Sequence, residues 1–161
     1  MIKKYILPIF IVIILTVIDQ FTKYLVIQNI QLNQEIPLLG NVLVLGHIQN
    51  KGAAWGSLSG MRILLLVITI IVSVAICYLY KKIIDKDKFR IVRICFTFIL
   101  GGAIGNMIDR IRFGYVTDFI YFKIINFPLF NFADICVTVS VFLLVFLFIF
   151  KYNSEDLEEI F

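Results

Sequence analysis

The stretch ILLLVITIIVSVAICYLY, residues 63–80, contains no charged side chain. A helix needs about 20 predominantly apolar residues to cross a hydrocarbon core of about 30 Å, and this stretch approaches that length. Three further segments are also long and apolar, at about residues 5–27, 92–111 and 132–150, although each of them contains charged residues. One such segment could be the buried helix of a water-soluble protein. Four of them in 161 residues predict an all-α integral membrane protein with four transmembrane helices.

The composition supports a membrane protein throughout. Hydrophobic residues make up 61% of the chain and charged residues 16%, with a mean hydropathy of +0.98. A soluble domain has about 45–50% apolar and about 25% charged residues, so a water-soluble fold is excluded. The net charge of +4 suggests membrane topology and contact with membrane lipids, and we expect no nucleic acid as a partner. Residues 1–161 are expected to form a single membrane-embedded domain.

The positions of Lys and Arg predict the orientation in the membrane. Residues 81–93 hold six cations, Lys3 and Lys4 precede the first span, and Lys151 follows the fourth. The positive-inside rule places these regions, and therefore both termini, in the cytoplasm. The cations that oppose this orientation are Lys51, Arg62, Arg110, Arg112 and Lys123.

The first apolar segment also resembles a secretory signal peptide. Cleavage of such a peptide requires small residues after the apolar region, yet the first alanine of the chain is Ala53. We therefore expect this segment to be a retained first span.

The segment at about residues 34–60, which would face outward, is the least helical part of the chain. Pro37 and Gly40-Asn41 are turn residues, and they flank short β-favouring runs such as Val42–Leu45. These features predict a small extracytoplasmic β-rich segment on the membrane surface. Trp55 is interpreted as an interfacial anchor.

Four aspartates from different parts of the chain, Asp19, Asp109, Asp118 and Asp134, fall at one membrane depth on the outer side. Ionisable groups within spans are costly, so they are either paired or functional. Asp19 is spaced i,i+4 from Lys23, which predicts an ion pair.

Asp109 belongs to a second polar group that we interpret as structural. Asn106, Asp109 and Arg110 share one helix face. Gly101 and Gly105 precede them at a spacing that allows a neighbouring helix to approach closely. A polar brace between helices is therefore expected here.

Asp118 and Asp134 have no cation within four residues. Asp134 can be the N3 residue of a capping box that begins at Asn131, and Asp118 can be a solvated loop residue. Both, however, lie among apolar residues, where two carboxyl groups without counter-ions tend to share one proton. An aspartic peptidase needs such a pair, because one carboxylate takes a proton from water while the other donates one to the scissile carbonyl.

Other catalytic arrangements have less support. Cys77, Cys95 and Cys136 are widely spaced within apolar runs and are interpreted as small buried hydrophobes. His47 is the only histidine, so a histidine-based triad or a metal site with several histidine ligands would have to rely on this residue alone. We expect a monomer that needs no cofactor and no metal.

Five motifs in this order resemble those of lipoprotein signal peptidase (signal peptidase II), and the resemblance extends over about residues 5–150. The motifs are DQFTK (19–23), NKGAAWG (50–56), GNMIDR (105–110), VTDF (116–119) and FNFAD (130–134). Trp55 differs from the phenylalanine that is frequent in the family.

The resemblance implies an endopeptidase of the bacterial inner membrane, with its active site near the outer face. It implies that signal peptides are cleaved from diacylglyceryl-modified prolipoproteins and that the cyclic peptide globomycin is an inhibitor. Asp118 and Asp134 correspond to the catalytic pair. Residues that would shape the pocket or hold the substrate are Asp19, Lys23, Asn50, Gly52, Asn106, Asp109, Arg110, Asn131 and Ala133.

Two other classes of function are alternatives. A proton-coupled carrier would also keep ionisable groups within its spans, but at several depths. A non-catalytic assembly protein would use Asp–Arg pairs only to join helices. The acidic tail at residues 155–159 is expected to be solvated and dispensable.

Overall fold

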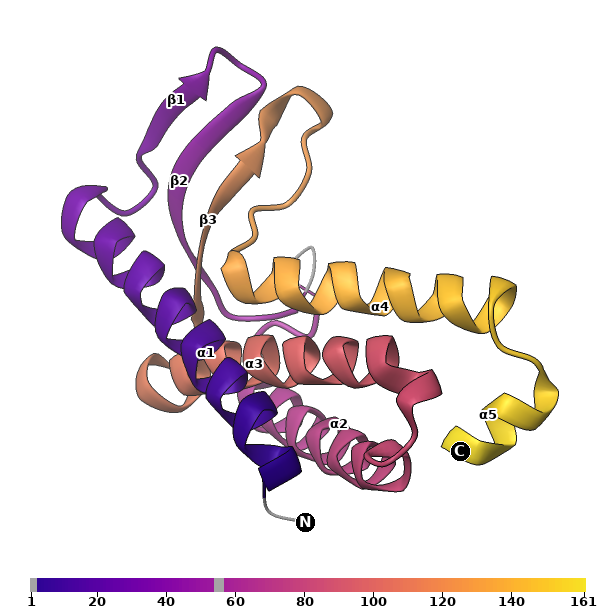
Figure 1. Ribbon diagram of the computed structural model, residues 1–161. Coiled ribbons are helices and arrows are strands. Elements are labelled where there is room, and N and C mark those ends of the chain that lie inside the picture. Colours follow the sequence, from indigo (N-terminus) through magenta and orange to yellow (C-terminus); the bar gives the residue numbers. More distant parts are fainter. Residues whose placement is uncertain (1–2, 54–56) are drawn as a thin grey trace.

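Four long helices dominate the computed structural model, which describes residues 3–53 and 57–161 (Figure 1). Each of the four is long and apolar enough to cross a membrane. Their bounds are α1 (Lys3–Asn29), α2 (Arg62–Ile83), α3 (Arg90–Phe113) and α4 (Phe132–Phe150). Helix α4 coincides with its predicted span. The other three extend slightly further than predicted, because their helical backbone continues into polar residues at the ends.

Helix α3 packs against each of the other three long helices. A Cβ atom at Gly101 would meet Leu15 of α1, and one at Gly105 would overlap the carboxylate of Asp19. Gly102 faces α4, where a Cβ atom would overlap the carbonyl oxygen of Ala133. The predicted glycine row therefore allows α1 to approach closely, and the adjacent glycine does the same for α4.

A three-stranded antiparallel sheet covers one end of the bundle, with strand order β1-β2-β3. Its strands are β1 (Glu35–Leu39), β2 (Leu43–Asn50) and β3 (Val116–Phe122), and a short helix η3 (Lys123–Ile125) follows β3. The predicted β-rich segment supplies only the first two strands. The third comes from the segment between α3 and α4, for which the sequence predicts a loop.

The position of Asp118 on β3 corrects the sequence-based prediction of a loop. Asp118 pairs with Ile48 of β2, after a register shift that lies between Leu45 and Ile48. The backbone of Asp118 is therefore fixed by strand pairing. Ala54, Trp55 and Gly56 lie outside the described residues, so the anchoring role of Trp55 stays a prediction.

The sheet is joined to the end of α1. Val26, Ile30 and Phe119 form a small buried apolar cluster between them. The Nδ1 atom of His47 lies 2.8 Å from the carbonyl oxygen of Ile30, and the backbone N–H of Asn33 donates to the carbonyl oxygen of His47. The single histidine thus ties β2 to α1.

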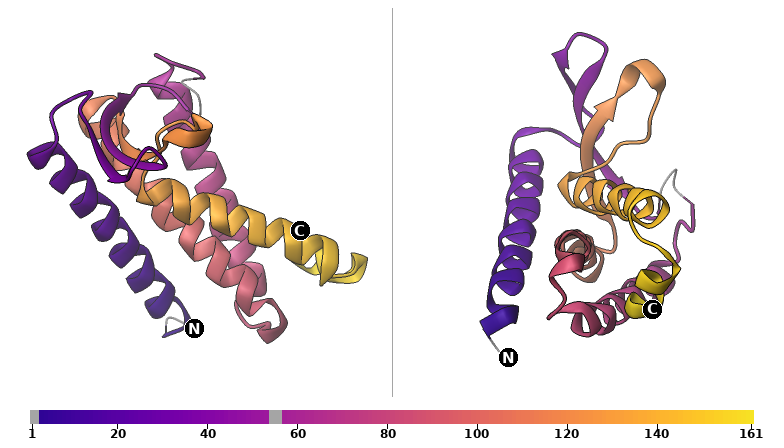
Figure 2. Two further views of the ribbon diagram at one scale, coloured as in Figure 1. Left: turned by 90° about the horizontal axis from the view of Figure 1, so that it is seen from above. Right: turned by 45° about the vertical axis from the view of Figure 1, so that its right-hand side comes forward.

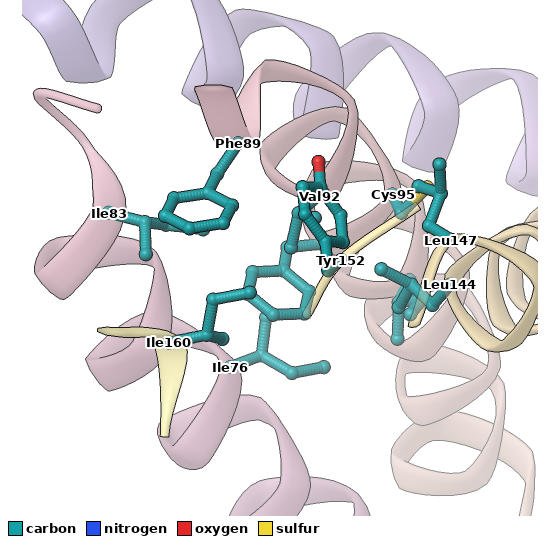
Figure 3. Packing of buried hydrophobic residues seen from close by; sticks show 11 residues of the cluster. Ile76, Ile83, Phe89, Val92, Cys95, Leu144, Leu147, Tyr152 and Ile160 are labelled. Atoms are coloured by element: carbon teal, nitrogen blue, oxygen red, sulfur yellow. The ribbon is translucent and has the colours of Figure 1, made fainter. Parts of the chain in front are cut away.

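The end of the bundle that carries residues 81–93 is called the basic end here, and the opposite end the sheet end. Figure 2 shows the two chain termini lying away from the sheet. A short helix, η2 (Asp87–Phe89), connects α2 to α3 at the basic end. Ile76, Ile83, Phe89 and Ile160 belong to one buried apolar cluster there (Figure 3).

The C-terminal helix α5 (Ser154–Ile160) is part of this cluster. The side chain of Ile160 is fully buried, and Lys86 pairs with Glu159 at 2.6 Å. Lys88 pairs with Asp156, whose carboxylate also caps the helix. The prediction of a solvated tail is therefore wrong for Asp156 and Leu157, which are covered, whereas Glu155, Glu158 and Glu159 are exposed as expected. The tail forms a short amphipathic helix that packs on the bundle.

Candidate active site

Three charged side chains form a buried group between α1 and α3 at the sheet end. The ammonium of Lys23 lies 2.8 Å from Asp19 Oδ2 and 3.0 Å from Asp109 Oδ2. All three side chains are at most 3% exposed. Gln20 donates to both carboxylates, at 3.2 Å to Asp19 and 2.9 Å to Asp109. The predicted Asp19–Lys23 pair is present, and Lys23 also serves a second carboxylate.

The carboxylates of Asp19 and Asp109 also accept backbone hydrogen bonds from α4 and β3. Asp19 accepts the N–H of Ala133 at 3.1 Å, and Asp109 accepts the N–H of Thr117 at 3.1 Å. Ala133 directly precedes Asp134, and Thr117 directly precedes Asp118. The buried ion pairs therefore fix the two backbone positions immediately before the remaining aspartates.

Asp118 is buried, with 3% of its surface exposed, and receives hydrogen bonds from two neutral amides. Asn131 Nδ2 donates to its Oδ1 at 2.7 Å, and Asn50 Nδ2 donates to its Oδ2 at 2.8 Å. Among residues 3–53 and 57–161, no cation lies within ion-pair distance of this carboxylate.

Asp134 is held in a similar way at the start of α4. Asn106 Nδ2 donates to its Oδ1 at 2.8 Å, and the backbone N–H of Asn131 donates to its Oδ2 at 3.1 Å. The second of these bonds belongs to the predicted capping box. Asp134 therefore caps its helix with one oxygen, while a neutral amide donor on α3 binds the other.

Asn131 and Asn106 link the two groups of aspartates. Asn131 Nδ2 donates to Asn106 Oδ1 at 3.1 Å, and Lys23 Nζ donates to the same oxygen at 2.9 Å. The ammonium thus orients the Asn106 amide so that its Nδ2 group faces Asp134. The ammonium of Lys23 makes no ion pair with Asp118 or Asp134, and these amides link it to both carboxylates.

Burial of Asp118 raises its pKa from 3.8 to about 7. The carboxylate of Asp134 raises this pKa as well, whereas the hydrogen bonds from Asn50 and Asn131 lower it. The side chain can therefore hold a proton near neutral pH, which a solvated aspartate cannot.

Asp118 and Asp134 line one cavity of about 270 Å³. Asn106 and Arg110 form part of its polar wall, and residues 127–130 form an apolar wall. A second hollow of about 250 Å³ shares Asn106, Arg110, Asp134 and Thr138 with this cavity and continues between α2 and α4. This second hollow therefore forms a side entrance to the cavity, next to Asp134.

The loop after β2 contributes the last predicted residues. Arg110 Nη2 donates to the carbonyl oxygen of Gly52 at 3.2 Å, and the N–H of Gly52 donates to Asn50 Oδ1 at 2.9 Å. These bonds place the loop beside the cavity and turn the amide of Asn50 toward Asp118.

All of the residues predicted for the site lie in this hydrogen-bonded region at the sheet end. Sequence reasoning did not single out Gln20 and Thr117, which complete the contacts of Asp19 and Asp109. Gln20 could have been recognised because it is a polar residue within an apolar span. Thr117 could not, because it acts through its backbone N–H, which every residue except proline carries. Cys95 and Cys136 are buried as expected, but Cys77 is exposed on α2.

Comparisons with known proteins agree with the fold and the motifs. The family model described as Signal peptidase (SPase) II matches residues 11–150. The lipoprotein signal peptidase of Enterococcus faecalis is 46% identical over 124 residues, which are 77% of this chain and 76% of that protein. That of Lactococcus lactis subsp. lactis is 42% identical over 142 residues, covering 88% of this chain and 92% of that protein.

A solved structure of a bacterial membrane enzyme is also similar. It has a TM-score of 0.79 at 32% identity, covering 88% of this chain and 87% of that chain. The four apolar helices and these relatives indicate a bacterial membrane protein of mostly helical fold with a small sheet, as the sequence predicts. The expected family is confirmed: this chain belongs to the signal peptidase II family, the lipoprotein signal peptidases.

Proposed function

We propose that this protein is an aspartic endopeptidase that cleaves signal peptides from diacylglyceryl-modified prolipoproteins, with Asp118 and Asp134 activating the attacking water. Membership of the signal peptidase II family implies the cleavage of prolipoprotein signal peptides. The observation that supports the mechanism is that two carboxyl groups line one cavity and receive hydrogen bonds from neutral donors only.

The chemistry requires one protonated and one ionised carboxyl group. Because the pKa of Asp118 is raised to about 7, the pair can share a single proton near neutral pH. The ionised member removes a proton from water as it attacks the scissile carbonyl, and the protonated member donates to the carbonyl oxygen. The carboxyl group that took the proton from water then donates it to the amine nitrogen as the C–N bond breaks, and the other carboxylate takes a proton from the diol. The pair thereby regains its single shared proton.

Substrate binding is assigned to the polar wall and to the side entrance. Asn50 and Arg110 line the cavity, where they can bind an extended peptide backbone, and Gly52 connects them through its hydrogen bonds. The hollow between α2 and α4 can admit the substrate from the bilayer, with its diacylglyceryl chains remaining among lipids. Globomycin is expected to compete for the same cavity.

The proposed orientation places the basic end in the cytoplasm and the sheet end at the outer face of the inner membrane. The cations of residues 81–93 support this orientation through the positive-inside rule. The strongly exposed apolar side chains of Leu39, Ile124 and Ile125 near the sheet suit contact with the membrane interface. We propose that the protein works as a monomer, since the cavity and both aspartates come from one chain.

The test uses purified protein in detergent with a diacylglyceryl-modified precursor and with the same precursor unmodified. The native protein should cleave only the modified form, and Asp118→Asn should reduce turnover by at least about 100-fold, because a positioned acid–base group contributes about 10²–10⁴. Cleavage of both precursors alike would contradict the assigned substrate. Full turnover by Asp118→Asn would remove this residue from the mechanism, and a carrier or an assembly protein would cleave neither precursor.

A further inference from the structure

A long groove lies on the face of α3 that is turned toward α1 and α2. It consists of two hollows, of about 550 and 540 Å³. Pro8, Tyr80 and Thr97 line both hollows, so the two are continuous. Neither hollow shares a lining residue with the active-site cavity or with its side entrance. The groove is therefore separate from the proposed peptidase site.

The hollow farther from the basic end is apolar. Val12 of α1, Val74 of α2 and Ile104 of α3 line it from three sides. The exposed Cys77 belongs to the same wall. In a bilayer this surface would contact hydrocarbon, so its shape and chemistry suit an acyl chain.

The hollow at the basic end is charged at its mouth. Lys4, Arg90 and Arg93 line it together with Asp85 and Asp87. Lys4 pairs with Asp85, and Arg93 pairs with Asp87 at 4.0 Å. Arg93 also donates to the carbonyl oxygens of Ile83 and Lys86 at 2.7 and 2.5 Å. The guanidinium of Arg90 makes no hydrogen bond or ion pair with any residue in 3–53 or 57–161.

The acidic residues of α5 do not reach this mouth. Asp156 and Glu159 pair instead with Lys88 and Lys86, neither of which lines the groove. The mouth therefore keeps an excess of positive charge, with Arg90 unpaired.

Hydroxyl groups separate the charged hollow from the apolar one. Tyr80 and Thr97 line both hollows, and the ring of Tyr5 lies 6.3 Å from that of Tyr80. Along one groove the lining thus changes from cations to hydroxyls and aromatic rings and then to hydrocarbon. A phospholipid has the matching order of phosphate, glycerol esters and acyl chains.

We propose that this groove binds one anionic phospholipid, with its phosphate near Arg90 at the charged mouth and an acyl chain between α1 and α2. Basic pockets between membrane helices on the cytoplasmic side suit such headgroups. A signal peptide is a poorer occupant, because its positively charged end would meet the positive mouth of the groove. A second copy of this chain is a poorer occupant for the same reason, since it would bring the same cations.

The test measures lipid binding by native mass spectrometry of the delipidated protein, titrated with phosphatidylglycerol or with phosphatidylcholine of identical acyl chains. The native protein should bind one phosphatidylglycerol at least about tenfold more tightly than phosphatidylcholine, since each cation near a membrane surface contributes roughly a fivefold preference. Lys4→Gln with Arg90→Gln should abolish that preference. The matched control, Lys81→Gln with Lys82→Gln, removes the same charge outside the groove and should keep it.

A second pair of variants tests the apolar half without changing charge. Cys77→Phe would fill the groove and should weaken binding of both lipids, whereas Ile71→Phe, on an exposed face of α2 outside the groove, should not. Melting curves establish that each variant is folded. Three outcomes would overturn the proposal. The native protein could show no preference for phosphatidylglycerol, the preference could survive Lys4→Gln with Arg90→Gln, or the control variants could lose binding to the same extent. Dimers forming in place of a lipid complex would assign the groove to a second copy.

Discussion

The two ends of the helical bundle bury different kinds of side chain. At the sheet end, Asp19, Lys23, Asp109 and Asp118 are at most 3% exposed. At the basic end the buried cluster is apolar. Asp156 is also buried there, but its partner Lys88 is exposed, and the ion pair of Lys86 lies at the surface. Burying charged groups is unfavourable for folding, whereas burying apolar groups is favourable and can offset that cost. The basic end therefore stabilises a fold whose sheet end is arranged for chemistry.

Within the sheet end, a second contrast separates two pairs of aspartates. Asp19 and Asp109 share the ammonium group of Lys23 and bind backbone N–H groups. Asp118 and Asp134 receive hydrogen bonds from neutral donors only. The ammonium group holds the first pair in fixed positions, whereas the neutral donors leave the negative charge of the second pair without a counter-ion. The first pair suits positioning and the second suits catalysis.

Lys23→Met should have the largest effect on stability. It leaves the buried carboxylates of Asp19 and Asp109 without a counter-ion, and breaking a buried pair in this way costs about 3–5 kcal/mol. Thermal unfolding in detergent measures the loss. Lys4→Met removes an ion pair at the exposed surface and should leave the melting temperature unchanged. Equal effects of the two variants would contradict the contrast between the ends.

Ile160→Ala should destabilise the basic end by about 2–4 kcal/mol, because it leaves a cavity in a fully buried position. Turnover per folded molecule should not change, since α5 lies far from the aspartates. Phe161→Ala is the matched control, as this side chain is 64% exposed. Full stability of Ile160→Ala would restore the view that the tail is dispensable.

Gly102→Ala should cost about 1–3 kcal/mol, because the new methyl group overlaps a backbone carbonyl that cannot move alone. The first turn of α4 would shift and carry Asp134 with it, so turnover should fall as well. Gly101→Ala meets only the side chain of Leu15 and should be milder in both respects. Unfolding curves and turnover rates of the two variants test this order.

A further prediction concerns the dependence of stability on pH. Burial raises the pKa of Asp118 from 3.8 to about 7, so between these values the folded protein holds a proton that the unfolded chain has released. Stability from this group should therefore fall as the pH rises through that window, and Asp118→Asn should remove the dependence. Turnover should also decline above about pH 7, as the shared proton is lost.

Much of the site could be predicted from the sequence, because a membrane restricts where polar residues can lie. Once the spans were located by hydropathy, Asp19, Asp109 and Asp134 had to share one depth. The partners within α1 and α3 followed from helical spacing, as for Asp19 and Lys23.

The strand β3 and the helix α5 could not be predicted in the same way. The residues of β3 are mostly apolar without a clear alternation, and the strand depends on pairing with β2, far away in the sequence. The tail has the acidic composition of a solvated segment, and only the burial of Ile160 reveals its packing. Both elements are defined by long-range contacts, which local patterns do not contain.

The most direct measurement compares Asp134→Asn with Asp109→Asn, because the two variants make the same chemical change in the two pairs of aspartates. For each, cleavage of the diacylglyceryl-modified precursor and the melting temperature are recorded together. Asp134→Asn should lower turnover by at least about 100-fold with a nearly native melting temperature, whereas Asp109→Asn should mainly lower the melting temperature. Native turnover by Asp134→Asn, or a loss of turnover that only follows its loss of stability, would contradict the assignment of Asp134 to the catalytic pair.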